Sequence, residues 1–380
     1  MKKKSSLYMD YSMLIVVVLL LCFGLIMVYS ASSYEASIKF NDSTYYLRSQ
    51  LRATVLGIAV MILVSRLDYH IWKKLAVVAY LGAAFLIMLV ITPLGMEING
   101  ARRWINVGVS LQPAEAAKLA VIVFCAAKIC VIQKSLRKLK GIIIWMGPGI
   151  VLAGMIYVIT KNMSSAIILL GITAIMIFVA SPRYLPYVIV TLLVVGGVFG
   201  VIYVVSHGLV PESLSTFRIG RIKAWLNPEA DASGKGYQTL QALYSIGSGG
   251  VLGKGLGQST QKLGYVPEAQ NDMIFSIICE ELGLIGALAV IVMFTILIWR
   301  FLIVANTAPD LFGSLLVVGV MAHISLQVVL NIAVVTNTIP NTGVTLPFIS
   351  FGGTSIVFLM TEIGIALNVS RAKPSQVQIY

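Results

Sequence analysis

The chain has little charge. Only 11% of its 380 residues are Asp, Glu, Lys or Arg, whereas 58% are hydrophobic, and the mean hydropathy is +0.92. This composition excludes a soluble globular protein. Apolar runs of about 20 residues recur along nearly the whole length, and each can cross roughly 30 Å of hydrocarbon. The sequence therefore predicts an all-α, polytopic integral membrane protein that forms a single domain over residues 1–380.

Cysteine and histidine are also scarce. The three histidines are isolated, and none belongs to a His/carboxylate pattern typical of a metal site. All four cysteines fall within apolar runs, which indicates core residues rather than a disulfide framework or a thiolate metal site: Cys22, Cys125, Cys130 and Cys279.

A nucleotide-binding motif is absent as well. The glycine-rich segment 247–260 reads GSGGVLGKGLGQST, but Lys254 is followed by Gly255 instead of Ser or Thr, so it fails the Walker A pattern. We expect no nucleotide cofactor. Two interpretations of this segment remain, a backbone that cradles phosphate and a re-entrant or interfacial loop.

About ten transmembrane helices are predicted. Their ranges are 11–31, 50–66, 75–94, 113–133, 142–160, 165–181, 187–206, 272–299, 312–335 and 352–369. Basic residues recur on one side of these spans: Lys2, Lys3, Lys4, Arg66, Lys73, Lys74, Lys134, Arg137, Lys138, Lys140, Arg183, Arg300, Arg371 and Lys373. The positive-inside rule makes that side the cytoplasm, with both termini inside.

This topology leaves one large loop, about 207–271, on the extracytoplasmic side, together with the loops 95–112 and 336–350. It also explains the net charge of +13 as a consequence of membrane orientation, so the charge does not indicate a nucleic-acid partner.

Four carboxylates gather in YVPEAQNDMIFSIICEELG, residues 265–283. A carboxylate near hydrocarbon is costly unless it is paired, solvated or used. Glu268 and Asp272 stand where the polar loop becomes apolar. Glu280 lies two helical turns beyond Asp272, a rise of about 12 Å. We therefore interpret Glu280 and Glu281 as buried structural partners rather than as part of the same chemistry.

Two groups of charged side chains near the predicted outer face have two interpretations each. Arg102 and Arg103, beside Trp104, are either interfacial anchors or a clamp for phosphate. Glu115 and Lys118 share one face of a helix, either as a structural ion pair or as part of an outward-facing polar cavity near Asp272.

A second basic patch contains Arg218, Arg221 and Lys223. Its spacing predicts an amphipathic helix on lipid head groups, with Phe217 and Trp225 as apolar contacts. The alternative is binding of a pyrophosphate-bearing lipid.

Two segments, ALNVSR (366–371) and LNPEADASGKGYQ (226–238), resemble the FtsW/SpoVE branch of the SEDS family of bacterial cell-envelope proteins. Several further motifs resemble this family, which includes FtsW, RodA and SpoVE. They follow the family's order over nearly the whole chain: GLIMVYSAS (24–32), NGARRWINVG (99–108), QPAEAAKL (112–119), GYQTLQALYSIGSGGVLGKGLGQS (236–259), VPEAQNDMIFSIICEELG (266–283) and NTGVTLPFISFGGTS (341–355).

The resemblance implies a peptidoglycan glycosyltransferase in the bacterial cytoplasmic membrane that polymerises lipid II at its outer face, for septal or spore-wall synthesis. It implies that Asp272 is essential, that Glu268 lies in the Pro-Glu motif, and that Glu115 and Lys118 line a polar cavity. Implied partners are lipid II, a class B penicillin-binding protein and other divisome or elongasome membrane proteins. A divalent cation, Mg²⁺ or Mn²⁺, is an implied cofactor, and Asp272 is interpreted either as a general base or as a ligand to this cation.

Elementary chemistry supports these roles. A sugar hydroxyl is a poor nucleophile and gains from a general base, for which Asp272 is the candidate. The departing pyrophosphate gains from cations, for which Arg102, Arg103 and Lys118 are candidates. Two other functions stay open, a lipid II flippase and a scaffold that only recruits partners.

One position departs from the family pattern: Asn162 stands where many relatives carry an aspartate, so it receives no acidic role.

Overall fold

The computed structural model describes residues 9–98, 101–106, 108, 110–133, 135–207, 217–234 and 236–372; for Ile98 and residues 217–219 it describes the backbone only. The helices are α1 (Tyr11–Phe40), α2 (Tyr45–Arg66), α3 (His70–Leu89), α4 (Pro113–Ile132), α5 (Leu139–Ile159), α6 (Met163–Ala180), α7 (Leu185–Ser206), α8 (Phe217–Leu226), α9 (Tyr237–Gly249), α10 (Ile274–Thr307), α11 (Leu311–Val335) and α12 (Gly353–Arg371). Part of the predicted charge bias lies outside the described residues: Lys2, Lys3, Lys4, Lys134 and Lys373.

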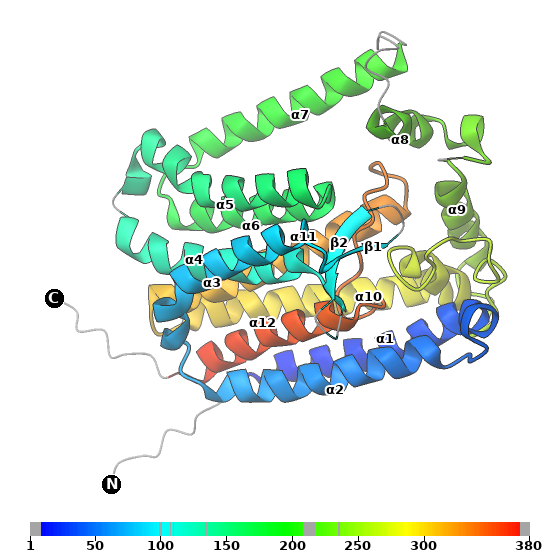
Figure 1. Cartoon of the computed structure of the whole chain (residues 1–380), viewed down its shortest axis with the longest axis horizontal. Coiled ribbons are helices and arrows are strands. Elements are labelled where there is room, and N and C mark those ends of the chain that lie inside the picture. Colours follow the sequence, from blue (N-terminus) through cyan, green and yellow to red (C-terminus); the bar gives the residue numbers. More distant parts are fainter. Residues whose placement is uncertain are drawn as a thin grey trace.

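All ten predicted spans are helices, namely α1 to α7 and α10 to α12 (Figure 1). Nine of the described helices are long and apolar enough to cross a membrane. The remaining span, α4, has 20 residues but carries Glu115, Lys118 and Lys128. The all-α membrane fold is therefore confirmed. The two largest boundary errors are at α1, which continues to Phe40 instead of ending at 31, and at α10, which continues to Thr307 instead of ending at 299.

The two ends of the described chain meet at one end of the bundle. The backbone N–H of Asp10 donates to Ser370 Oγ at 3.2 Å, and Arg300 Nη2 pairs with Asp10 Oδ2 at 2.6 Å. An even number of spans requires this arrangement. Figure 1 shows the start of α1 and the end of α12 at the same side, while the loops that carry the candidate site lie at the opposite end, here called the site end.

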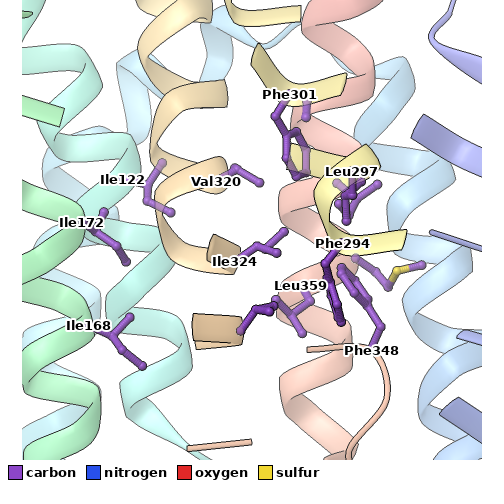
Figure 2. Packing of buried hydrophobic residues seen from close by; sticks show 14 of the residues in the cluster. Ile122, Ile168, Ile172, Phe294, Leu297, Phe301, Val320, Ile324, Phe348 and Leu359 are labelled. Atoms are coloured by element: carbon purple, nitrogen blue, oxygen red, sulfur yellow. The ribbon is translucent and has the colours of Figure 1, made fainter. Parts of the chain in front are cut away.

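Aromatic and branched side chains of α10, α11 and α12 fill the centre of the bundle. Figure 2 shows Phe294 and Phe301 of α10 facing Ile324 of α11 and Leu359 of α12, and each of these four side chains is at most 2% exposed. The loop before α12 reaches this core through the buried Phe348. A Cβ at Gly24 of α1 would collide with the Phe348 carbonyl oxygen, so this close approach requires glycine.

A small antiparallel sheet covers part of the site end. It contains β1 (Gly95–Ile98), β2 (Ala101–Asn106) and β3 (Ser110–Leu111), in the order β1-β2-β3. Thr354 Oγ1 donates to the Ser110 carbonyl at 3.1 Å and ties β3 to the start of α12. The sequence predicted only a loop here, and the sheet is what fixes the directions of Arg102 and Arg103.

The helix α7 stands apart from the rest. It crosses above the bundle at an angle in Figure 1, and Val205 is its one buried residue. Large apolar side chains along it are mostly exposed, including Leu192 at 66% and Phe199 at 67%. Such a surface is stable only against lipid tails, which agrees with a membrane-spanning helix.

Candidate active site

Asp272 lies in the turn that immediately precedes α10. Glu268 begins this turn in the left-handed region, with φ 55°, and its carbonyl accepts the backbone N–H of Asn271 at 2.9 Å. Neighbouring elements clamp the turn: Ser350 Oγ donates to the Asn271 carbonyl at 2.6 Å, and Asn331 Nδ2 of α11 donates to the Asp272 carbonyl at 2.8 Å. The backbone of Asp272 is therefore fixed by groups distant in sequence.

The Asp272 side chain is buried but poorly satisfied. It is 9% exposed, and its Oδ1 has no hydrogen-bond partner among the described residues. Burial, followed by the nearby negative charge of Glu268, raises the pKa of Asp272 from 3.8 to about 7. Asp272 Oδ2 faces Gly343, where even a Cβ would lie 3.7 Å away, so the glycine leaves room beside the carboxylate. This is a carboxylate that can take up a proton near neutral pH.

One guanidinium group, that of Arg221, lies near this carboxylate, and a second, that of Arg103, lies near Arg221. The charge of Arg221, on α8, acts on Asp272, and Arg221 Nη1 donates to the Asn341 carbonyl at 3.3 Å. Arg103 Nη2 of β2 donates to the Lys161 carbonyl at 3.5 Å. Burial, together with the charge of Arg221, lowers the pKa of Arg103. Two positive charges held this close together suit a ligand with more than one negative charge.

Arg102 points away from this group. Successive side chains of a strand alternate between its two faces, so Arg102 and Arg103 cannot both face the site. Arg102 is exposed and stands opposite Glu97 of β1. The structure thus divides the predicted pair of arginines and brings only Arg103 toward Arg221.

The second basic patch is helical, as predicted, and forms α8. The Arg218 side chain lies outside the described residues, and Lys223 is exposed. Trp225, expected to contact lipid, instead donates its indole N–H to the Asn337 carbonyl at 2.9 Å. The helix is therefore held against the loop between α11 and α12.

Glu115 and Lys118 form a buried ion pair on α4, with 2.8 Å between Oε1 and Nζ. Ser355 Oγ of α12 donates to Glu115 at 3.2 Å, and Lys118 Nζ lies 3.5 Å from Gln327 Oε1 of α11. Gln327 Nε2 in turn donates to the Thr345 carbonyl at 3.0 Å. The pair thus supports the loop over Asp272 through Gln327.

Glu362 of α12 is a further carboxylate inside the bundle, and it has a buried partner. His323 Nδ1 of α11 lies 2.8 Å from Glu362 Oε2 of α12, and both side chains are fully buried. His323 also lies within electrostatic range of Glu115, so the two buried pairs are neighbours inside the bundle.

The glycine-rich loop binds the two glutamates of α10. Lys254 Nζ pairs with Glu280 Oε1 at 2.6 Å, and the backbone N–H of Thr260 donates to the same oxygen at 3.0 Å. Ser245 Oγ and Ser259 Oγ donate to Glu280 Oε2 at 3.1 and 2.5 Å. The loop does cradle an anion, but that anion is a carboxylate of the protein.

Glu281 is held in the same way. Lys262 Nζ lies 2.8 Å from its Oε1, and Ser30 Oγ of α1 donates to both of its oxygens at 2.7 Å. The prediction that Glu280 and Glu281 are buried structural partners is confirmed: both are 0% exposed and ion-paired.

A break in α10 makes room for this loop. Gly283 has φ 65° and ψ −165°, so the helix is interrupted there. The freed N–H groups of Leu284 and Ile285 donate to the carbonyls of Gly250 and Val251. A Cβ at Gly253 would collide with the backbone of α10, and a Cβ at Gly283 would collide with the backbone of the glycine-rich loop. The glycine-rich segment is therefore a loop that packs against the break in α10 and replaces the hydrogen bonds lost there.

Sequence reasoning missed the partners of these carboxylates. Lys254 and Lys262 lie in the loop predicted to be extracytoplasmic, where basic residues are disfavoured, and that was the available signal that acidic partners were near. Asn331 hydrogen-bonds to the backbone of Asp272, and Gly343 leaves space beside its side chain. No sequence pattern predicted either role, because both depend on contacts between distant segments. Asn162 accepts the Ser165 N–H at 3.1 Å and caps α6, which accounts for a polar residue there.

Within the described part of the chain, no group of three or more His, Cys, Asp or Glu side chains is arranged so that it could hold a metal ion. Asp272 and Glu268 offer two carboxylates, one of them with an unpartnered buried oxygen. Mg²⁺ commonly takes one or two protein carboxylates together with substrate phosphates. The donor set therefore fits a cation that binds with a phosphorylated substrate, and the predicted cofactor stays a prediction.

Together these features define a polytopic membrane protein with a candidate acid–base site at one end of its bundle. The chain belongs to the FtsW/RodA/SpoVE family, whose model, described as cell cycle protein, matches residues 11–375. It is thus a multi-pass protein of the bacterial cytoplasmic membrane.

Known proteins support this membership. Stage V sporulation protein E of Bacillus subtilis is 40% identical over 365 residues, covering 95% of this chain and 97% of the relative. A probable peptidoglycan glycosyltransferase FtsW of Trichlorobacter lovleyi is 40% identical over 366 residues, covering 95% and 93%.

Solved structures share the fold. A chain of a peptidoglycan synthase complex matches with a TM-score of 0.77 at 23% identity, covering 96% of this chain and 98% of that one. The rod shape determining protein RodA of Thermus thermophilus matches with a TM-score of 0.67 at 23% identity, covering 96% and 98%.

Proposed function

We propose that the chain is a peptidoglycan glycosyltransferase that polymerises lipid II at the outer face of the cytoplasmic membrane. The observation that carries the proposal is Asp272, a buried carboxylate with an unpartnered oxygen and a pKa of about 7 at the site end of the bundle. Relatives 40% and 37% identical over 366 residues are named probable peptidoglycan glycosyltransferases.

The reaction needs one proton transfer at this position. The C4 hydroxyl of an N-acetylglucosamine gives its proton to Asp272, and the hydroxyl oxygen forms a bond to the anomeric carbon of an N-acetylmuramic acid. The bond from that carbon to the pyrophosphate breaks, and the lipid pyrophosphate leaves with the electron pair. A general base contributes typically about 10²- to 10⁴-fold, most efficiently when its pKa is near the operating pH, as the pKa of Asp272 is.

Arg103 and Arg221 suit the pyrophosphate, because Arg221 lies near Asp272 and Arg103 lies near Arg221. Both guanidiniums can offer several N–H donors to phosphate oxygens. Lys118 is paired with Glu115 and 1% exposed, so its contribution to the site passes through Gln327 and Thr345. A divalent cation on Asp272 and Glu268, when bound, would supply further neutralisation of the pyrophosphate charge.

A class B penicillin-binding protein is the proposed partner. The similar chain of known structure comes from a complex in which polymerization and crosslinking are coordinated. A polymerase that delivers strands to a transpeptidase in the same complex would join both steps of wall synthesis at one place.

The flippase alternative gains no support from the carboxylates inside the bundle. Intramembrane carboxylates lining a path would need to be accessible to the head group. Glu280, Glu281 and Glu362 are each 0% exposed, and each faces a basic residue. These groups are accounted for by packing.

Polymer formation from purified lipid II tests the proposal. The wild type and Asp272→Asn would be compared with the candidate transpeptidase partner, with and without divalent cation. We expect glycan chains from the wild type and none above background from the variant. Equal polymer from both would remove Asp272 from the mechanism, and lipid II movement across liposomes without polymer would favour a flippase.

A further inference from the structure

A cavity of about 270 Å³ lies beside the candidate active site, between α8, α9 and the loop that follows α11. Arg221 and Trp225 of α8 line one side, Tyr237 and Gln238 of α9 another, and Asn341 closes it. None of the functions assigned so far uses this cavity as a whole. Its volume is near the lower end of ligand pockets, about 300 Å³, so it accommodates one ring-sized unit rather than a lipid.

The cavity shares two walls with the Asp272 site. Gln238 Nε2 donates to the Pro267 carbonyl at 3.3 Å, immediately before Glu268. Asn341 Oδ1 accepts the backbone N–H of Gly343 at 3.0 Å, and Gly343 is the residue that faces Asp272 Oδ2. A group bound in the cavity is therefore next to the carboxylate, with only these short segments between them.

The lining suits a neutral, hydroxyl-rich and amide-bearing ligand. It offers the side-chain amides of Gln238 and Asn341, the hydroxyls of Tyr237 and Thr239, and the indole of Trp225. Among the described residues that line the cavity, Arg221 is the cationic one. The guanidinium donates to the Asn341 carbonyl, and the two amides are joined by a 2.8 Å hydrogen bond, so the polar groups are already oriented. A pyrophosphate would call for several cations, whereas amides and aromatic rings match an N-acetylated sugar.

We infer that this cavity is a glycan subsite that holds one N-acetylated sugar ring of the strand next to the bond being formed. The inference rests on the proposed polymerase function, because it places sugar beside the Asp272 carboxylate. Binding there keeps the strand aligned between successive additions, while the lipid anchor remains in the bilayer. Loss of the subsite should therefore shorten the product more than it slows the first bond.

Filling the cavity without removing a polar contact tests this directly. Ala224 lines the cavity and is 6% exposed, so Ala224→Leu places apolar volume inside it. Ala232→Leu is the matched control, because Ala232 is exposed, lies outside the lining and receives the same change. Both would be made in the full chain and assayed for polymer length on gels and for binding of a lipid-free, N-acetylated glycan tetrasaccharide by calorimetry.

We expect the tetrasaccharide to bind wild type, Asp272→Asn and Ala232→Leu equally, and Ala224→Leu at least tenfold more weakly, with shorter chains from Ala224→Leu. Unchanged binding and chain length in a folded Ala224→Leu would overturn the subsite. Because binding to Asp272→Asn needs no turnover, it separates this inference from failure of the polymerase proposal.

A second measurement uses only the wild type and so does not depend on how the variants fold. A tetrasaccharide carrying a photoreactive group would be cross-linked to the protein and the labelled peptides identified. Labelling of the segments around Trp225 and Gln238 supports the subsite. Labelling confined to other segments, or no specific binding, overturns it.

Discussion

Asp272 and the pair Glu280–Glu281 belong to one 19-residue stretch, yet their environments are opposite. Every oxygen of Glu280 and Glu281 accepts a hydrogen bond, and each glutamate has a lysine partner. Asp272 is nearly as buried, but one of its oxygens has no partner among the described residues, and its nearest charged neighbour along the turn is Glu268. The glutamates bind the glycine-rich loop to α10, whereas Asp272 retains an oxygen, Oδ1, that is available to accept a proton.

This contrast shows how one helix terminus can be both rigid and reactive. The ion pairs of Glu280 and Glu281 fix the glycine-rich loop and the broken helix behind the site. That rigid base lets the fold maintain an incompletely satisfied carboxylate, which by itself is unfavourable. Stability and chemistry are divided between residues eight positions apart.

The sharpest way to break the comparison is Asp272→Asn. Loss of the base should lower polymerisation by about 10²- to 10⁴-fold. The folded pKa of about 7 lies above the ordinary 3.8, so folding favours the protonated form, and wild-type stability falls as pH rises from about 4 to 7. The neutral Asn avoids this cost, and we expect higher thermal stability than wild type at pH 8, by up to about 4 kcal/mol. A variant that is active, or markedly less stable, would contradict this assignment.

Removing one partner of a buried glutamate should affect stability instead. Lys262→Ala leaves Glu281 without its cation, a change that typically costs about 3–5 kcal/mol. The double change Lys262→Met with Glu281→Leu removes both charges and should recover most of that loss. Thermal unfolding in detergent measures both. If the single and double variants were equally stable, the ion pair would not be what holds the loop.

The two arginines of β2 test which face of this strand contacts the substrate. Arg103→Ala removes a charged donor near the site, worth about 10- to 100-fold in kcat/KM if it contacts pyrophosphate. Arg102→Ala alters the opposite face of the strand and should change kcat/KM by no more than about twofold. Equal losses from both would show that the alternation of β2 does not decide which arginine meets the substrate.

The smallest expected change, a shift in the midpoint of the pH profile, is also the most specific one. Polymerisation should fall about tenfold per pH unit below pH 7, as Asp272 takes up the proton that it must accept in the reaction. Glu268→Gln removes a negative charge that raises this pKa, so the midpoint should move to lower pH. Initial rates between pH 5 and 9 would measure it. A midpoint that does not respond to Glu268→Gln would point to another titrating group.

The sequence predicted most of the fold, because hydrocarbon thickness sets a minimum length for each apolar run and loop charges set its direction. All ten predicted spans are helices, and the segments joined at the site end are the predicted outer loops. The break at Gly283 was invisible to this reasoning, since a helix-length apolar run does not reveal whether its backbone is continuous. Only the backbone of the incoming glycine-rich loop shows why the helix stops there.

The candidate site was predictable in its residues more than in its geometry. Asp272 and Glu268 stand at the polar–apolar boundary, which pattern alone reveals. The separation of Arg102 from Arg103 depends on a strand register between β1 and β2 that no local pattern specified. Likewise, Asn331 and Gly343 matter only because α11 and the loop after it fold onto the turn before α10.

The bond between Ser30 and Glu281 has a consequence for how the protein is made. The two residues are 251 positions apart. At about 5–20 residues per second, roughly 10–50 s pass between the synthesis of one and the other. The first helix is therefore in the membrane before Glu281 is synthesised, and Ser30 lacks this hydrogen-bond partner until the seventh further span, α10, is inserted. The support behind Asp272 is thus assembled late, so an incompletely translated chain lacks the finished site.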